Sequence, residues 1–369
     1  MKIGIMLRHI NELGGIVVYT VNLIEELLKN DSKNEYVFIY NRPEFLGRYS
    51  GYHNVREKVV KMPNKLLWDQ FAVPVVARKE KLDLIFNPKL SIPLFTHCKT
   101  ILVYHGAEQF AVPELFKWHD RMYFKTIVPF YFAKADAVIS MTYKGSKDLT
   151  RLVGANEKKI TAIYESHHNR FRVIEDQKAL KKIREKYRLP EKFILFVGGL
   201  APLKNFGNLL RAYQKLDKKI SINLVAVGFK RWKFESDLRL INELKLDGKV
   251  IFTGFVPDED LPAIYSLAHQ FILPSFYEGF GIPVLEAMAC GCPVITSTTG
   301  CSSEVSGDAA VLIDPRDVDG IAEAMYKIAV DTDLRNKMVE KGLKRAKDFS
   351  WEKCARETLA LFESVVDSR

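Results

Sequence analysis

The sequence predicts an α/β protein made of two doubly wound domains, each built on a parallel sheet. Apolar runs of strand length alternate with helical patterns almost from end to end, and this alternation favours parallel sheets. The 369 residues are enough for two domains with a sizeable core in each. A polar, lysine-rich stretch over residues 165–190 predicts the inter-domain connection. We therefore expect a first domain over residues 1–168 and a second over residues 169–350.

Composition and cysteine usage are those of a soluble, reduced protein. Hydrophobic residues make up 47% of the chain and charged residues 27%, as in ordinary globular proteins. No apolar run reaches the roughly 18 residues that a spanning helix needs. The first residues indicate a strand, not a signal peptide. The five cysteines show no disulfide spacing and predict free thiols in a cytoplasmic protein, without a metal site: Cys98, Cys290, Cys292, Cys301 and Cys354.

The net charge of +10 is unevenly distributed. Residues 1–170 hold 25 Lys plus Arg against 17 Asp plus Glu, an excess of eight, and the remaining residues contribute +2. A basic first half favours anionic lipid, nucleic acid or a phosphorylated acceptor as partner. A merely solvated basic surface explains the charge equally well. Nothing in the chain resembles a base-reading module, so we expect no nucleic-acid partner.

The first half contains six expected strands, over residues 3–7, 36–40, 81–86, 99–104, 136–141 and 159–164. Gly14 and Gly15 lie between the first strand and an amphipathic helix over residues 17–28, where their amides can approach an anion. His105 follows the strand over residues 99–104, at the edge where ligands of open α/β sheets bind. Position alone favours a structural role for this histidine.

Residues 110–132 are dense in aromatic side chains, with Lys117, Arg121 and Lys125 interleaved among them. We expect most of these rings in the core. A minority is expected on a membrane-facing or acceptor-facing surface. The aromatic residues are Phe110, Phe116, Trp118, Tyr123, Phe124, Phe130, Tyr131 and Phe132.

The second half repeats the alternation of strands and helices. Gly198, Gly199 and then Lys204 at a helix start follow its first strand, an arrangement that suits an anion. A lysine at such a place is otherwise most often a surface residue. Two Asp-x-Asp stretches, at residues 317–319 and 331–333, precede helices and are interpreted as N-caps, not metal ligands. The expected strands cover residues 193–197, 224–227, 250–253, 271–274, 293–296 and 311–313.

The most informative stretch runs over residues 276–291, FYEGFGIPVLEAMACG. Gly279 and Gly281 allow the backbone to approach a ligand closely, and Pro283 suits the first turn of a helix. The expected strand, glycine loop and helix N-terminus would attract an anion, a phosphate above all, through free amides and the helix dipole.

Two carboxylates frame this loop. Glu278 precedes the glycines and Glu286 lies about one turn into the helix. Each alone is equally well explained as a solvated acid or one favoured by the helix dipole. Together, the two Glu separated by seven residues around Gly-Phe-Gly resemble the signature of retaining GT-B glycosyltransferases, specifically glycosyltransferase family 4. The resemblance extends over nearly the whole chain. It implies two Rossmann-like domains facing across a cleft, with a C-terminal helix over residues 351–369 packing back on the first.

The resemblance also implies how the donor would be bound. Glu278 is expected beside the donor sugar and Glu286 on the ribose, while backbone at the turn containing Phe255 lines the base. Gly199 stands where many family members carry Arg, so one positive charge is missing there. The intervening backbone is expected to hold the diphosphate: Gly279, Phe280, Gly281 and Ile282.

Three residues are expected to be catalytic by the same resemblance: Glu278, His105 and Lys204. Lys204 matches the lysine that pairs with the donor diphosphate, and His105 matches a strand-end histidine that reaches the donor sugar. Gly14 and Gly15 are expected to face the donor phosphates and the acceptor.

The function implied is transfer of a glucosyl, mannosyl or N-acetylglucosaminyl unit from a nucleoside-diphosphate sugar to an acceptor hydroxyl, with retention of the anomeric configuration. Neither a metal nor a cofactor is expected. The acceptor would be a carbohydrate or a lipid-linked molecule in cell-surface polysaccharide or glycolipid assembly, and the protein cytoplasmic, with peripheral association on the inner, anionic membrane face. Two alternatives are a sugar-nucleotide epimerase on the same fold and a basic, non-enzymatic binding protein.

Overall fold

The computed structural model describes residues 1–12, 14–229 and 234–368. These residues form two compact units. Unit 1 combines Met1–Glu165 with Ser350–Arg369, and unit 2 holds Ser166–Phe349. The chain therefore leaves unit 1 after Glu165 and returns to it at Ser350.

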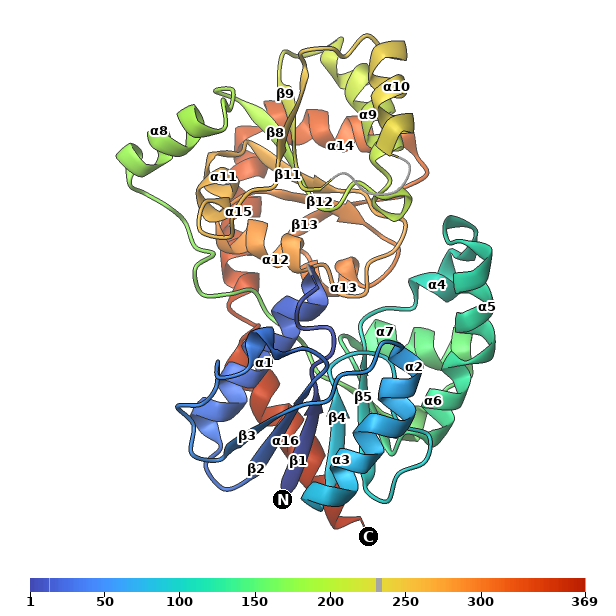
Figure 1. Cartoon of the computed structure of the whole chain (residues 1–369). Helices are drawn as coiled ribbons and strands as arrows, with labels where there is room; N and C mark the ends of the chain where they lie inside the picture. The colour runs from blue at the N-terminus through green and yellow to red at the C-terminus, as the bar shows by residue number, and fades with distance from the viewer. Residues whose placement is uncertain (13, 230–233, 369) are drawn as a thin grey trace. The chain divides into compact units, whose positions relative to one another are not determined.

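Unit 1 is built on a seven-stranded sheet with the order β3-β2-β1-β4-β5-β6-β7 (Figure 1). All neighbouring pairs are parallel. The central strands are buried on both faces, which is why they are nearly continuous apolar runs in the sequence. The strands are β1 (Lys2–Met6), β2 (Glu35–Tyr40), β3 (Val55–Val59), β4 (Leu84–Asn87), β5 (Lys99–Tyr104), β6 (Ala137–Ser140) and β7 (Ile160–Ala162).

The helices of unit 1 include the last helix of the chain, α16 (Trp351–Asp367), which packs against α1 (Gly15–Asn30). The rings of Phe86 on β4 and Phe362 on α16 lie 5.0 Å apart between centroids, so the C-terminal segment completes the core of this unit. The other helical segments are η1 (Pro43–Phe45), α2 (Lys65–Leu67), η2 (Trp68–Ala72), α3 (Val73–Glu80), α4 (Glu108–Ala111), η3 (Pro113–Leu115), α5 (Trp118–Thr126), α6 (Val128–Lys134), α7 (Tyr143–Asp148), η4 (Leu149–Val153) and η5 (Glu157–Lys159).

Unit 2 repeats the plan with a six-stranded parallel sheet in the order β10-β9-β8-β11-β12-β13. The prediction of an α/β fold with two doubly wound sheets is therefore confirmed. The strands are β8 (Phe193–Val197), β9 (Asn223–Val227), β10 (Val250–Gly254), β11 (Gln270–Leu273), β12 (Val294–Ser297) and β13 (Ala310–Ile313). The helical segments are α8 (Gln177–Lys186), η6 (Pro202–Lys204), α9 (Phe206–Asp217), α10 (Phe234–Glu243), α11 (Leu261–Leu267), α12 (Ile282–Ala289), α13 (Ser302–Ser306), α14 (Val318–Val330) and α15 (Thr332–Ala346).

Several local predictions are confirmed. Asp317 and Asp331 are the N-caps of α14 and α15, and their carboxylates accept hydrogen bonds from the amides of Gly320 and Leu334 at 2.9 and 2.8 Å. The side chain of Ser350 caps α16 in the same way. All five cysteines are free thiols in buried positions.

The prediction that most rings of residues 110–132 lie in the core is wrong. Only Tyr131 and Phe132 are buried, whereas Trp118 is 74% and Phe130 61% exposed, and the other four rings are half-buried. The reason is that α5 has no buried residue, because it lies on the outside of unit 1. Among the described residues, none of the helices combines the length and apolar character needed to cross a bilayer.

Candidate active site

In the sheet of unit 2 the direction in which successive strands are added reverses between β8 and β11. The chain runs from β8 to β9 and β10 on one side, and β11 to β13 follow on the other. At such a switch point the loops after the two strands diverge, and ligands of open α/β sheets bind in the resulting crevice at the carboxyl ends. Here the loop after β8 carries Gly198, Gly199 and Lys204, and the loop after β11 carries Glu278.

Lys204 and Glu278 meet at this switch point. The Nζ of Lys204 lies 2.6 Å from Oε1 of Glu278, and the Ser275 hydroxyl donates to the same oxygen at 2.5 Å. The side chains are 23% and 12% exposed, so the pair is shielded from water but reachable. The two loops are also joined through their backbones, since the amide of Phe276 donates to the carbonyl of Leu203 at 2.9 Å. The pair is therefore fixed in place before any ligand binds.

A tight loop leads from Glu278 into α12. Gly281 is the N-cap of this helix with φ 96°, a left-handed conformation that favours glycine, and a Cβ there would lie 2.9 Å from the Ser302 hydroxyl. The helix starts at Ile282 with a proline in its first turn, as predicted. Pro283 has no N–H and the amide of Val284 donates to the Gly281 carbonyl at 2.8 Å, so the amide that the first turn of α12 offers to an anion beside Lys204 is that of Ile282.

Phe280 is placed differently from its neighbours. Its ring is 3% exposed and packs edge-on against Phe349, with 5.8 Å between centroids. The ring therefore anchors the glycine loop to the core of unit 2, and any contact with a ligand would come from the Phe280 backbone. Gly199, Gly279 and Ile282, by contrast, are half-exposed.

Glu286 lies in the second turn of α12, half-buried against α11. The Tyr265 hydroxyl donates to its Oε2 at 3.0 Å. Burial is the main cause that raises the pKa of Glu286 to about 8. Without a ligand the carboxyl group is therefore largely protonated at neutral pH, and it can both donate to and accept from a ligand hydroxyl.

Phe255 forms part of an exposed aromatic pair that sequence reasoning identified only in part. Its ring stacks on that of Phe229, with centroids 4.9 Å apart and planes inclined by 19°. The rings are 56% and 39% exposed, and they follow the neighbouring strands β10 and β9. They give unit 2 a flat apolar surface on which a planar ring system can stack. The sequence signal that could have identified Phe229 is its position directly after Gly228, at the end of a strand.

Gly300 is a second residue that the sequence did not single out. A Cβ on it would lie 2.5 Å from the amide nitrogen of Glu278, and its φ is 64°. The next amide, that of Cys301, donates to the Glu278 carbonyl at 2.7 Å. The backbone of Glu278 is thus held against residues 300–301, which explains the need for glycine there.

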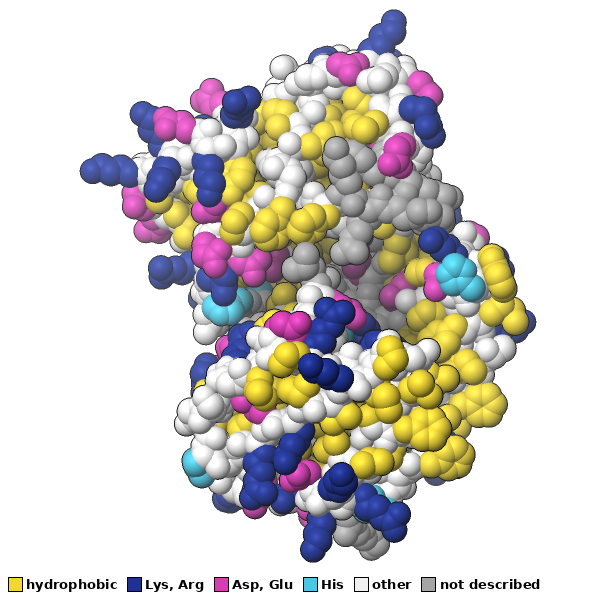
Figure 2. Space-filling view, viewed as in Figure 1, with side chains coloured by type: hydrophobic (Ala, Val, Ile, Leu, Met, Phe, Trp, Pro, Cys, Tyr) yellow, Lys and Arg dark blue, Asp and Glu magenta, His cyan; other side chains and the backbone are white. Residues whose placement is uncertain are grey.

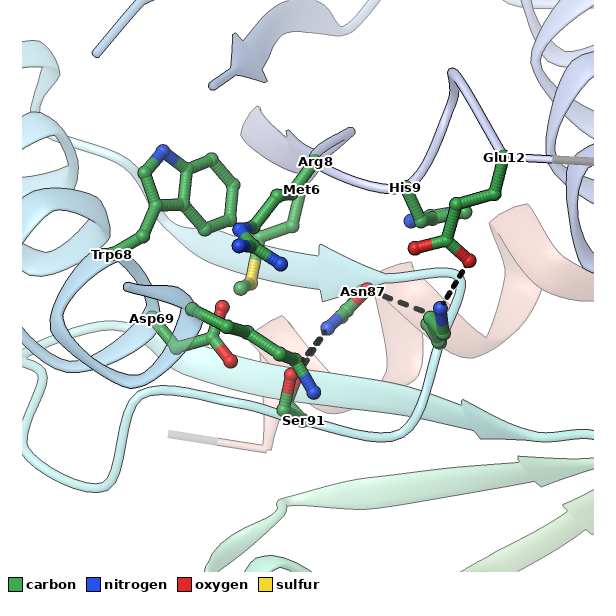
Figure 3. A pocket seen from close by; sticks show the side chains of 10 residues that line it. Met6, Arg8, His9, Glu12, Trp68, Asp69, Asn87 and Ser91 are labelled. Atoms are coloured by element: carbon green, nitrogen blue, oxygen red, sulfur yellow. Dashed lines mark hydrogen bonds and ion pairs between the residues drawn. The ribbon is translucent and has the colours of Figure 1, made fainter. Parts of the chain in front are cut away.

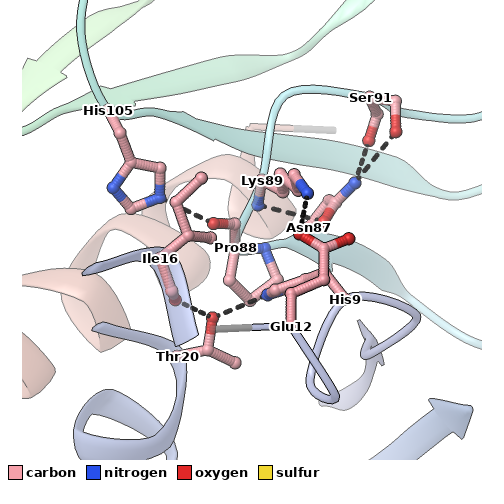
Figure 4. Close-up of polar contacts among 9 residues, drawn as sticks. All are labelled: His9, Glu12, Ile16, Thr20, Asn87, Pro88, Lys89, Ser91 and His105. Atoms are coloured by element: carbon pink, nitrogen blue, oxygen red, sulfur yellow. Dashed lines mark hydrogen bonds and ion pairs between the residues drawn. The ribbon is translucent and has the colours of Figure 1, made fainter. Parts of the chain in front are cut away.

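In unit 1, His105 follows β5, and its Nε2 lies 2.8 Å from the carbonyl oxygen of Pro88 (Figure 4). Since a carbonyl only accepts, Nε2 carries the proton. The ring also packs edge-on against Tyr19, at 5.0 Å between centroids. Burial lowers the pKa of His105 to about 4, so the ring is neutral at pH 7 and its Nδ1 is an acceptor.

Gly14 and Gly15 are exposed at the start of α1. Gly14 is the N-cap of the helix with φ 130°, and Gly15 is its first residue. The adjoining Leu13 lies outside the described residues. Within unit 1, then, the structure places the predicted residues at the N-terminus of α1 and at the end of β5. Within unit 2 it brings together Lys204, Glu278 and the start of α12.

Both halves of the chain match known protein families. Residues 13–165 match the family model described as Glycosyltransferase Family 4, and residues 178–345 match that of Glycosyl transferases group 1. O-antigen chain mannosyltransferase B of Escherichia coli is 39% identical over 184 residues, which cover 49% of this chain and 48% of that protein. Mannosylfructose-phosphate synthase of Agrobacterium fabrum is 31% identical over 67% of this chain and 56% of that protein. The chain thus spans about half the length of these curated relatives.

Solved structures resemble this chain along nearly its whole length. HepE of Anabaena, in complex with UDP and glucose, superposes with a TM-score of 0.79 at 17% identity over 99% of this chain and 100% of that chain. Sucrose-phosphate synthase of Thermosynechococcus elongatus gives a TM-score of 0.81 at 20% identity, with complete coverage of both chains. At such identities the likeness concerns the fold.

Proposed function

The chain belongs to the family 4 glycosyltransferases of the GT-B fold, and we propose that it transfers a hexosyl unit from a nucleoside-diphosphate sugar to an acceptor hydroxyl with retention of the anomeric configuration. The observation that carries this proposal is the Lys204–Glu278 pair beside the N-terminus of α12. Cationic and amide donors converge there next to a carboxylate, as a diphosphate with an attached sugar requires.

Each group in unit 2 has a role in this proposal. Lys204 and the amide of Ile282 at the start of α12 bind the diphosphate and stabilise the negative charge that grows on it as the sugar departs. Glu278 lies at the sugar end of the diphosphate, and Glu286 binds the ribose hydroxyls from the second turn of α12. The exposed face of Phe255 and Phe229 receives the base. No metal enters the scheme.

His105 supports the donor sugar from unit 1. Because the Pro88 carbonyl accepts the proton of Nε2, the neutral ring presents Nδ1 as an acceptor for a sugar hydroxyl. The low pKa of His105 keeps the ring uncharged, so it adds no positive charge to the site at neutral pH. Gly14 and Gly15 would face the donor phosphates from the start of α1.

The names of the relatives favour mannose as the sugar to be tested first. O-antigen chain mannosyltransferase B and mannosylfructose-phosphate synthase both carry mannosyl transfer in their names. The solved relative HepE holds UDP and glucose. We therefore propose a hexosyl donor, tested as GDP-mannose, UDP-glucose and UDP-N-acetylglucosamine, and an acceptor in polysaccharide assembly.

The decisive experiment is a thermal-shift panel of these donors and their nucleoside diphosphates, followed by transfer assays with the donor that stabilises the protein. A ligand that binds only the folded state raises apparent stability by mass action. NMR of the product would give its anomeric configuration. Lys204→Met should abolish the shift, and Lys215→Met, which removes an exposed lysine of unit 2, should not. Absence of any nucleotide-dependent shift, or conversion of the donor without an acceptor, would refute the proposal.

We further propose that unit 1 associates with an anionic membrane face. Support comes from its exposed apolar side chains, which gather over the α2–α6 side of this unit (Figure 2), and from the exposed Lys117, Arg121 and Lys125 on or beside α5. Basic residues near such a surface each contribute about 1 kcal/mol. The apolar residues and their exposures are Leu66 56%, Phe71 61%, Val75 53%, Phe95 81%, Trp118 74%, Met122 52% and Phe130 61%.

Vesicle flotation tests this association. The protein should float with anionic vesicles at low salt, float less at high salt, and ignore neutral vesicles. Replacing Trp118 and Phe130 together by Ser should abolish flotation without changing nucleotide binding, because both are exposed side chains of unit 1. Failure of the wild-type protein to float with anionic vesicles at low salt would contradict the membrane proposal and leave glycosyl transfer untouched.

A further inference from the structure

Unit 1 has a switch point of its own, between β1 and β4, and a pocket lies there. The chain runs from β1 to β2 and β3 on one side, while β4 and the later strands lie on the other. Arg8 follows the end of β1, and Asn87 and Lys89 lie at and just beyond the end of β4. The pocket has a volume of about 60 Å³ (Figure 3). Ligands of open α/β sheets bind at this kind of position.

The pocket is rich in cations. Arg8, Lys65 at the start of α2, and Lys89 come to it from three separate segments of the chain. The Nζ of Lys89 is paired with Oε2 of Glu12 at 2.7 Å (Figure 4). Within the described part of the chain no ion pair involves Arg8 or Lys65, and the buried Nε of Arg8 has no hydrogen-bond partner. Two positive charges thus face the pocket with no carboxylate in ion-pair contact with either. Burial lowers the pKa of Lys65, and the Asp69 carboxylate in the same pocket acts against that shift.

A buried acid completes the lining. Asp69 is 1% exposed, and its Oδ2 has no hydrogen-bond partner among the described residues. Burial raises the pKa of Asp69, against the smaller opposing effects of Lys65, the Ser91 side chain and Arg8. Leaving a buried polar oxygen unsatisfied costs roughly 1–3 kcal/mol. A ligand hydroxyl that donates to Oδ2 of Asp69 would remove this cost.

The remaining walls contribute no charge. Trp68 is fully buried, and its indole N–H donates to the Val60 carbonyl at 2.9 Å, so it serves as an apolar wall. Burial and the nearby Lys89 lower the pKa of His9 to about 3, and its Nε2 lies 2.8 Å from the Thr20 hydroxyl. His9 is therefore neutral. Low polarity on one side of the pocket strengthens the attraction between Arg8, Lys65 and an anion.

We propose that this pocket binds a phosphate group of the acceptor, with Arg8 and Lys65 donating to the phosphate oxygens and Asp69 accepting from a hydroxyl beside it. The inference rests on the proposed function, because it assumes that unit 1 holds the acceptor. A volume of about 60 Å³ leaves room for a small group such as a phosphate. The sugar or lipid that carries the phosphate lies outside the pocket. Donors from separate segments suit the tetrahedral oxygens of a phosphate better than a planar carboxylate.

Calorimetric titration with inorganic phosphate tests the proposal. A saturating nucleoside diphosphate is present, so that the phosphate site of unit 2 is filled. Lys65→Met should weaken phosphate binding about 10–100-fold, the loss of a hydrogen bond to a charged group. Asp69→Asn removes a negative charge and should tighten it. Lys33→Met, an exposed lysine of the same unit, should leave it unchanged. If phosphate affinity falls in the Lys65 variant and rises in the Asp69 variant, misfolding is excluded as the cause, because misfolding would lower the affinity of both.

Two further arms identify the source of the phosphate. A soluble hexose phosphate and a short alkyl phosphate are titrated in the same way, and the tighter binder shows whether a sugar or a lipid carries the group. The inference is overturned if wild-type protein binds none of the three probes at millimolar concentration, or if Lys65→Met and Arg8→Gln bind phosphate as tightly as wild type. Nucleoside diphosphate binding is measured in the wild type and in every variant. If the wild type does not bind a nucleoside diphosphate, the proposed function is wrong. If diphosphate binding is normal but the pocket substitutions leave phosphate affinity unchanged, only the phosphate pocket is wrong.

Discussion

Glu278→Gln should bind a nucleoside diphosphate more tightly than the wild-type protein while transferring sugar more slowly. In the ligand-free structure Lys204 is already paired with Glu278 at 2.6 Å, so the diphosphate must compete with that carboxylate for the lysine. The carboxylate also repels an incoming anion. Glutamine keeps the shape and a hydrogen bond to Lys204 but removes the negative charge, and both effects then favour the diphosphate.

The expected size follows from the exposure of the pair. A hydrogen bond between charged groups is worth about 1.5–3 kcal/mol, but Lys204 is 23% exposed and glutamine retains part of the contact, so roughly 1 kcal/mol should be released. That corresponds to a gain of about fivefold in affinity. Turnover should fall by a larger factor, because Glu278 lies at the sugar end of the site, where the charge of the transition state develops.

Calorimetry with UDP and GDP, on wild type, Glu278→Gln, Lys204→Met and the double variant, measures these effects. Glu323→Gln is the matched control, since Glu323 pairs with Lys327 on the exposed face of α14. In the Lys204→Met background the Glu278 substitution should gain less, because no lysine remains to be released. Weaker diphosphate binding by a folded Glu278→Gln protein would refute the reasoning, as would an equal gain in both backgrounds.

Three other predictions concern the same unit. In the folded protein Glu286 keeps a proton that the unfolded chain releases above its ordinary pKa, so the free energy of unfolding should fall between about pH 4.5 and 8, by up to about 1.4 kcal/mol per pH unit. Denaturant titrations should show a smaller fall for Glu286→Gln. Identical pH profiles of the two proteins would contradict this prediction. Gly300→Ala should displace the Glu278 backbone and reduce turnover more than 10-fold. The control Gly248→Ala should keep full activity, because Gly248 also has a positive φ, 73°, but no atom lies within 4 Å of the added Cβ. Equal activity of the two variants would argue against the contact between Gly300 and Glu278. Transfer should survive EDTA, because Lys204 and the amide at the start of α12 are expected to hold the diphosphate. A complete loss of transfer that Mg²⁺ restores would contradict this prediction.

The sequence predicted the buried strands well because parallel strands covered on both faces are continuous apolar runs. The expected bounds of β5 and β8 coincide with those observed. The edge strand β3, VREKV, was missed, because its three consecutive charged residues at a half-exposed edge give no such apolar run. Helices α10 and α11 were missed as well; the proline at the start of α11 and its seven-residue length give a weak helical signal.

The candidate site was predictable residue by residue but not as an arrangement. Lys204 and Glu278 were each singled out, yet their contact joins positions 74 residues apart and depends on β8 pairing with β11. Asp69 and Lys65 gave no sequence signal at all, since neither belongs to a motif; only the fold carries them to the ends of β1 and β4. The aromatic stretch was misjudged because ring density was taken as a sign of burial, while the helix that carries Trp118 has no buried face.

The discontinuity of unit 1 has a consequence for the order in which the chain folds during synthesis. Its core needs α16, whose Trp351 and Phe362 pack against Tyr19 of α1 and Phe86 of β4. Glu165 is followed by the whole of unit 2 before that helix is made. At about 5–20 residues per second, the roughly 200 intervening residues take about 10–40 s to translate. During this interval unit 1 lacks α16 and its core is incomplete. Unit 2 can therefore finish folding on the ribosome before unit 1, although most of unit 1 is synthesised first.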